Sequence, residues 1–263
     1  MHPISPAALQ RYLISSKVMN YQVVEETIRA GYREVTPQYR QDDETEVMTE
    51  NHRRIMATLQ QLCHSFEHPI RALDIGCGTG RYFHCLTNVS ELLGMDISEE
   101  MLRAAENPVR QEQITIPSIR LICANAYLTN FPPAAFDLIY SLGMFGNGCP
   151  VTTEICNKFH HWLAPGGKLY FNTVDIAGLP FLARARRQAR EKVYPMLTRK
   201  LQATLDERAA RHPFFGMSQT DLEQVLSESR FRKFQVKSHV CQSPLWNGRH
   251  LECIAIKDEA QVA

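Results

Sequence analysis

Apolar and polar positions along the chain follow two different patterns. In the first part, up to about residue 66, apolar residues recur at helical spacing, as at Val47, Ile55, Leu59 and Leu62, which predicts an amphipathic helix. From Ile70 onward, short apolar runs alternate with helix-like stretches. Such alternation favours a doubly wound α/β fold, in which a mostly parallel sheet is covered by helices on both faces.

Seven apolar runs are the candidate strands of this sheet. The first five read IRALDIG, ELLGMD, SIRLICA, FDLIYSLG and GKLYFNTV. The last two read FRKFQVKSHV and HLECIAIK, and we expect them to pair antiparallel through the turn-rich segment CQSPLWNGR. Three helices are predicted between the runs: one capped by Ser98, one with Ile155 and Phe159 on its buried face, and one capped by Ser218.

The same change of pattern suggests the domain organisation. We expect residues 1–66 to form an N-terminal helical lid that presents Tyr32 and Tyr39 at the edge of the sheet. Residues 67–263 would then form the sheet domain, with a helical cap inserted at about residues 178–215.

Charge and composition narrow the class of protein. Lysine plus arginine number 29 and aspartate plus glutamate 28, a balance that disfavours a dedicated nucleic-acid binder. No apolar run is long enough to span a membrane, and the start MHPISPAALQRYL lacks a signal-peptide layout, so we expect a cytoplasmic protein without membrane partners. The eight cysteines form no C-x-x-C pair, so reduced, buried thiols and no metal site are expected.

Three alternating glycines mark the candidate binding site. Gly76, Gly78 and Gly80 lie in ALDIGCGTGRYFHCL, between the first strand and an expected helix, where they would let a ligand approach the backbone. The spacing is not the G-x-G-x-x-G of dinucleotide folds, and the G-K-[ST] of a P-loop is absent. Asp96 ends the next apolar run, where a carboxylate can accept both hydroxyls of a ribose.

Five segments in order then resemble the motifs of one family. They are LDIGCGTG, GMDIS, CANAYL, FDLIYSLG and WLAPGGKLYF. The chain is thereby similar to the class I S-adenosylmethionine-dependent methyltransferases, and in particular to their type 11-like small-molecule branch. The resemblance covers residues 70 to 175 well and the C-terminal strand pair loosely. It implies a seven-stranded Rossmann-like fold and S-adenosyl-L-methionine as the cofactor.

The resemblance also implies where the cofactor would bind. Gly76 and Gly78 would face its methionine part and Asp96 its ribose, while Asn125 stands where the family usually carries an acid that contacts adenine. The implied cofactor-binding residues are Asp74, Gly76, Cys77, Gly78, Gly80, Asp96, Ile97, Met101, Asn125, Ala126, Ser141 and Leu142.

The reaction expected from this resemblance is in-line methyl transfer to a small-molecule acceptor. Such a reaction mainly needs alignment and exclusion of water, so the sequence names no catalytic base. Ser141-Leu142 replaces the [DN]-P-P-[YF] of DNA amino-methyltransferases, and the order Cys149-Pro150 is reversed relative to carbon-5 pyrimidine enzymes. Two alternatives stay open: an RNA- or protein-directed methyltransferase, and a non-catalytic S-adenosylmethionine-binding protein.

Candidates for the acceptor side come from three segments. They are Tyr39, Phe145, Asn147, Arg186 and Arg190. The two arginines belong to the basic stretch FLARARRQAREKVYP, which either attracts an anionic acceptor or is only a solvated face. The identity of the acceptor, the atom that is methylated and the oligomeric state are left open by the sequence.

Overall fold

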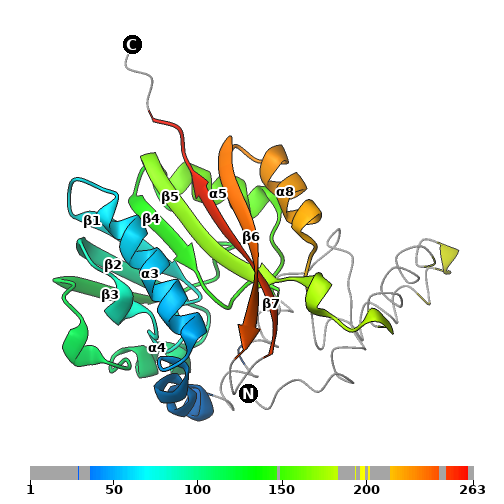
Figure 1. The fold of residues 1–263 in the computed structure, drawn as a ribbon. Coiled ribbons are helices and arrows are strands. Elements are labelled where there is room, and N and C mark those ends of the chain that lie inside the picture. The colour runs from blue at the N-terminus through cyan, green and yellow to red at the C-terminus, as the bar shows by residue number, and fades with distance from the viewer. Residues whose placement is uncertain are drawn as a thin grey trace.

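The computed structural model describes residues 36–146, 149–182, 214–242 and 247–259, together with residues 29, 193, 196–198 and 201. Within these residues the chain builds one twisted sheet with helices packed on both of its faces (Figure 1). The predicted α/β architecture is therefore confirmed.

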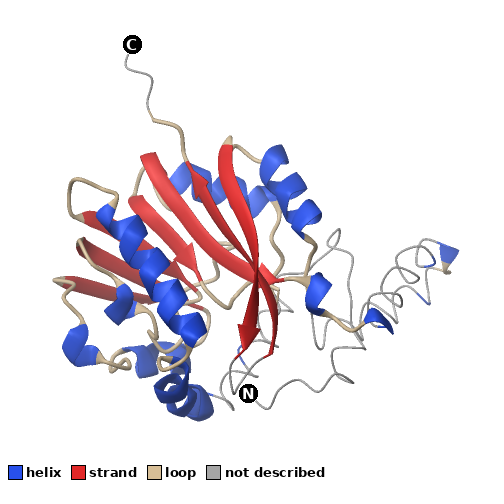
Figure 2. Cartoon of the chain, viewed as in Figure 1, coloured by secondary structure: helices blue, strands red, loops and turns tan. Residues whose placement is uncertain are grey.

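The sheet has seven strands in the order β3-β2-β1-β4-β5-β7-β6. The strands are β1 (Ile70–Ile75), β2 (Val89–Asp96), β3 (Ser118–Cys123), β4 (Phe136–Ser141), β5 (Leu163–Val174), β6 (Lys233–Gln242) and β7 (Asn247–Ile256). The first five pair in parallel, and β7 lies antiparallel between β5 and β6 (Figure 2). The predicted antiparallel pairing of the last two strands is thus confirmed.

Helices cover the two faces of this sheet with separate apolar clusters. On one face α3 (Glu50–His64) and α4 (Glu99–Ala105) pack over β1, β2 and β4, and on the other α5 (Thr153–Trp162) and α8 (Gln219–Glu228) pack over β4, β5 and β7. The remaining named helices are the short turns η1 (Phe83–Cys85), η2 (Gln111–Gln113) and η3 (Ile176–Gly178). Residues 36–46 form a further helix before α3.

The helix starts follow the capping signals in the sequence. The Ser98 hydroxyl accepts the backbone N–H of Met101 at the start of α4, and Ser218 and Asp221 form a complete capping box at the start of α8. Ile155 and Phe159 are buried on α5, as the spacing predicts.

Two local predictions are wrong. Val47 lies in the turn between helix 36–46 and α3, although its side chain is buried as expected. No α-helix follows the glycine segment: a turn leads directly into η1. The eight residues from Arg81 to Asn88 would span only about 12 Å as a helix. The return along a six-residue strand such as β1 needs about 20 Å, so a helix over the whole segment could not reach the start of β2.

These elements do not test the domain boundaries predicted from the sequence. The expected cap at residues 178–215 falls largely outside the described residues, as does Tyr32. Among the described residues, no helix is both long and apolar enough to cross a membrane.

Candidate functional site

The candidate site lies where the parallel strands end. Strand order reverses between β1, which is followed by β2 and β3 on one side, and β4, which is followed by β5 on the other. In open α/β sheets, ligands bind at the carboxyl ends of the strands beside such a reversal. The predicted cofactor residues lie at the ends of β1, β2 and β4 and in the segments that follow β1, β2, β3 and β4.

The glycine loop after β1 is held in a left-handed conformation. Gly76, Gly78 and Gly80 have φ values of +72°, +53° and +77°, a region that favours glycine. The N–H groups of Gly76 and Cys77 both donate to the carbonyl of Met95, at 2.7 and 3.0 Å, which ties the loop to β2. A Cβ atom at Gly78 would meet no atom within 4 Å, so the backbone faces open space at this residue.

Asp96 holds this loop from the end of β2. The Gly78 N–H donates to Asp96 Oδ2 at 2.8 Å, and the Ser98 N–H donates to Asp96 Oδ1 at 2.9 Å. The side chain is 8% exposed, and burial raises the pKa of its carboxyl, while the hydrogen bonds from Ser98 and Gly78 oppose that shift. Each oxygen retains a second lone pair, so the carboxylate can accept hydroxyl groups of a ligand.

A buried aspartate of the N-terminal segment braces the same loop. Asp43 is fully buried and accepts hydrogen bonds from Thr79 Oγ1 and Arg81 Nε, each at 2.5 Å. Tyr39 lies on the same helix; burial raises the pKa of its hydroxyl, on which the charges of Arg81 and Asp96 also act. Helix 36–46 therefore packs beside the glycine loop.

The segments after β2 and β3 carry the residues predicted to surround adenine. Ile97 is half-buried and Met101 is buried at the start of α4. Asn125 is half-buried, and its side-chain oxygen accepts the backbone N–H of Tyr127 at 2.9 Å, so it closes the turn after β3. Ala126 is buried beside it.

The segment after β4 is fixed by polar contacts with its neighbours. The Ser141 hydroxyl donates to the Ile75 carbonyl at 2.8 Å, which joins the ends of β4 and β1, and Leu142 is buried next to it. The Gly143 N–H donates to the Asn172 side-chain oxygen on β5 at 2.7 Å. Phe145 is 2% exposed and packs edge-on against Phe171, which leaves little of its ring to contact an acceptor.

Burial also raises the pKa of Asp74 and of two thiols near the site. Burial raises the pKa of Asp74, which is 2% exposed on β1, to about 8, with the Tyr140 hydroxyl acting in the opposite direction. Burial also raises the pKa of Cys77 well above its ordinary value and that of Cys149 to about 12. Neither cysteine is a thiolate near neutral pH, so neither is suited to nucleophilic attack.

The remaining acceptor-side candidates are not described. Asn147, Arg186 and Arg190 lie outside the residues that the structure describes.

Two residues with clear structural roles at this end of the strands were not predicted from the sequence. Asp43 and Asn172 each hold a loop of the site through side-chain oxygens. Their partners are distant in the sequence: Thr79 is 36 residues from Asp43, and Gly143 is 29 from Asn172. A polar residue at a buried position of a predicted helix or strand is the only signal that could have marked them.

The residues at this edge fit a nucleoside cofactor. Asp96 presents a fixed carboxylate for a ribose, and the backbone at Gly78 and at Gly143 faces open space, since a Cβ atom at either glycine would meet no atom within 4 Å. A loop whose backbone is this accessible, next to a rigid carboxylate, can bind a molecule that combines a diol with a polar tail.

Comparison with known proteins matches the part of the chain that carries the candidate site. Residues 72–167 match the model of a family described as "Methyltransferase domain". Over 106 residues the chain is 30% identical to the ubiquinone biosynthesis O-methyltransferase of Methylococcus capsulatus, a match that covers 40% of this chain and 44% of that relative. The chain therefore spans less than half the length of this curated relative.

A second relative matches over a longer range. The malonyl-[acyl-carrier protein] O-methyltransferase of Enterobacter lignolyticus is 27% identical over 173 residues, which cover 65% of this chain and 62% of that protein. Among solved structures, a phosphoethanolamine N-methyltransferase 2 of Haemonchus contortus, in complex with phosphomonomethylethanolamine and S-adenosylhomocysteine, superposes with a TM-score of 0.55. That superposition covers 78% of this chain and 53% of the other at 15% identity, and it shows a shared fold.

Proposed function

We propose that this chain is a class I S-adenosylmethionine-dependent methyltransferase and that it transfers a methyl group from S-adenosylmethionine to a small-molecule acceptor. The observation that carries this proposal is the joint geometry of Asp96 and Gly78. One carboxylate both fixes the glycine loop and faces the edge at which a cofactor would bind.

The chain's own residues would act mainly by holding the cofactor. Asp96 would accept the two ribose hydroxyls, and the exposed backbone at Gly78 would allow the methionine part to lie against the loop. Met101 and Ala126 would enclose the adenine, and the remaining candidates of the loop, Asp74 and Gly80, would support its shape.

The chemistry needs little further help from the protein. S-adenosylmethionine supplies a methyl group on a sulfonium, which a nucleophile displaces in line. The segment after β4, from Ser141 to Gly143, is fixed at both ends by hydrogen bonds, so it is a rigid wall against which an acceptor can be aligned. Tyr39 and helix 36–46 would exclude water from the opposite side.

The acceptor that we propose is a small molecule with an oxygen nucleophile, and an anionic one is favoured. The two relatives compared above are named as O-methyltransferases, and the one with the longer match is named for a malonyl group, which is acidic. Arg186 and Arg190 would supply the matching positive charge, as proposed from the sequence.

A methyl-transfer assay tests this function. The purified full chain is incubated with S-adenosylmethionine carrying a radiolabelled methyl group and with fractionated cell extract. We expect label in the small-molecule fraction and its loss with the Asp96→Ala variant. The matched control is Asp137→Ala. Asp137 is also 8% exposed, but it lies at the start of β4, at the opposite end of the strands.

The outcomes of this assay separate the alternatives. Label in RNA or protein would overturn the proposed acceptor, and no label in any fraction would overturn the proposed activity. Equal loss of label with Asp96→Ala and Asp137→Ala would overturn the assignment of Asp96.

A further inference from the structure

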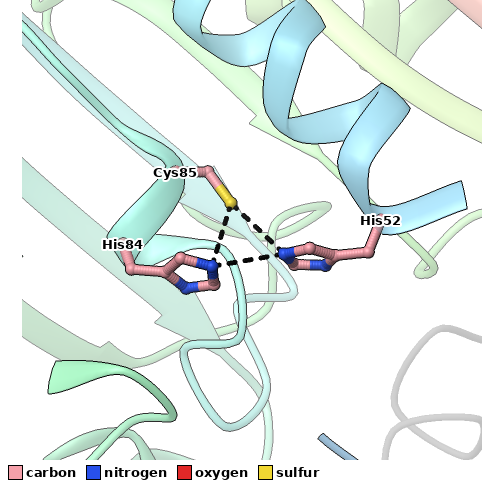
Figure 3. Close-up of side chains that lie close together, drawn as sticks. All are labelled: His52, His84 and Cys85. Atoms are coloured by element: carbon pink, nitrogen blue, oxygen red, sulfur yellow. Dashed lines mark hydrogen bonds between the residues drawn. The ribbon is translucent and has the colours of Figure 1, made fainter. Parts of the chain in front are cut away.

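Two histidines and a cysteine meet beneath α3. His52 is on α3, and His84 and Cys85 are on η1 (Figure 3). The Nε2 atoms of His52 and His84 are 3.2 Å apart, and Cys85 Sγ is 3.6 Å from each of them. All three side chains are buried, and their nitrogen and sulfur atoms point toward one common centre (Figure 3).

The triangle formed by these three atoms has the dimensions of a metal site. A tetrahedral zinc ion with Zn–N bonds of about 2.05 Å and Zn–S bonds of about 2.3 Å requires ligand separations of about 3.3 Å (N···N) and about 3.6 Å (N···S). The observed separations are 3.2 Å for the nitrogen pair and 3.6 Å for both nitrogen–sulfur pairs. All three edges therefore agree with one ion bound to all three atoms.

The chemistry of the three residues suits the same ion. Imidazole nitrogen and thiolate sulfur are the ligands that zinc prefers, and the imidazole must be neutral to bind. The Cys85 thiol would release its proton when the metal binds.

We propose that His52, His84 and Cys85 form a structural site for Zn²⁺. No fourth histidine, cysteine or carboxylate joins this group among the described residues, so the fourth ligand is a water molecule or another small ligand. No metal site was expected from the sequence, because its cysteines form no C-x-x-C pair. In this site only His84 and Cys85 are adjacent, and His52 comes from a helix 32 residues earlier.

The position of the site explains what a metal would do. The segment after the glycine loop has no α-helix of its own and continues only as η1. A metal bridging His52 to His84 and Cys85 would fasten this segment to α3, next to the ion pair by which Asp43 holds Arg81. The ion would thus stabilise the base of the glycine loop and would take no part in methyl transfer.

A metal titration of the full chain tests this proposal without any activity measurement. The purified protein is stripped with a chelator, its folding is checked by circular dichroism, and Zn²⁺ binding is measured by equilibrium dialysis with elemental analysis. We expect one Zn²⁺ per chain and a higher Tm in the metal-bound form. Co²⁺ in place of Zn²⁺ should give the visible bands of tetrahedral cobalt and a thiolate-to-cobalt charge-transfer band.

Variants identify the ligands. Cys85→Ala and His84→Ala should each weaken Zn²⁺ binding by more than about 100-fold, the upper end of what loss of even an outer-shell partner costs. The matched control is Cys156→Ala. Cys156 is also buried, and burial raises the pKa of its thiol to about 12, as it does for Cys85. It lies on α5, which packs on the opposite face of the sheet.

The proposal is overturned if the stripped, folded wild-type chain binds no stoichiometric Zn²⁺ or Co²⁺. It is also overturned if cobalt binds without a thiolate band, or if the folded His84→Ala variant binds zinc as tightly as the wild type. Should Cys85→Ala not fold, the wild-type cobalt spectrum still decides whether sulfur is a ligand. None of these readouts depends on methyl transfer, so a failure here leaves the proposed function untouched.

Discussion

Asp43 offers a sharp test of how the N-terminal segment supports the site. Its side chain is fully buried, and its two oxygens accept hydrogen bonds from Thr79 Oγ1 and Arg81 Nε in the glycine loop. The variant Asp43→Asn keeps the shape of the side chain and one of the two acceptors, but it removes the negative charge. The Arg81 guanidinium then remains largely buried without its counter-charge.

The expected size of the effect follows from this burial. Breaking a buried ion pair by removal of one partner costs about 3–5 kcal/mol, because the other charge is left uncompensated. Arg81 retains 22% of its side-chain exposure, so water screens it in part and we expect the lower end, about 3 kcal/mol. The neighbouring variant Asp42→Asn should cost about 1 kcal/mol, because Asp42 accepts a hydrogen bond from the neutral amide of Gln38.

Urea unfolding of four proteins measures this effect: the wild type, Asp43→Asn, Arg81→Met and the double variant. The double variant should be only slightly less stable than the less stable of the two single variants, which corresponds to a coupling energy of about 2 kcal/mol. A cost below about 1 kcal/mol for Asp43→Asn, or additive single effects, would refute the ion pair as the link between helix 36–46 and the glycine loop.

Three further predictions follow from the same structure. Gly78→Val should weaken S-adenosylmethionine binding at least about tenfold by calorimetry. Gly166→Val should leave the affinity unchanged, since Gly166 also has a positive φ but lies near the start of β5; equal affinities of the two variants would contradict this. Asp74 keeps its proton in the folded state up to about pH 8 but loses it near pH 3.8 when unfolded. Between these values the free energy of unfolding should therefore fall as pH rises, by up to about 1.4 kcal/mol per pH unit. Asp74→Asn should flatten that slope in unfolding experiments at pH 5 to 7, and an unchanged slope would assign the pH dependence to other groups. Ser218→Ala should lower stability by about 1 kcal/mol in urea unfolding through loss of the capping box of α8, and an unchanged midpoint would show that the cap does not matter.

The strands were predictable because their signal is local. The run FDLIYS at β4 is buried along its whole length, and loops between runs carry glycine or capping residues that mark where a run ends. The antiparallel pairing of β6 and β7 was also predictable, because two neighbouring runs separated by a turn-rich segment form a hairpin.

The features that could not be predicted from the sequence depend on contacts between residues that are far apart along the chain. The helix expected after Gly80 does not form because its eight residues cannot span the return to β2, a constraint that appears only once β1 and β2 are known to be parallel neighbours. Asp43, His52 and Asn172 are single polar residues in helices or strands, and their roles follow from partners that only the folded chain brings near. The spacing of residues within a segment carries no information about such contacts.

The most direct test of the account is the affinity of the folded chain for its cofactor. Calorimetry with S-adenosylhomocysteine, which undergoes no turnover, would compare the wild type with Asp96→Ala and with the control Asp137→Ala, each first shown to be folded. The account predicts specific binding to the wild type and to Asp137→Ala, and an affinity about 30-fold weaker, about 2 kcal/mol, for Asp96→Ala, because charge-assisted hydrogen bonds are lost. No binding to the wild type, or equal affinity of all three proteins, would contradict it.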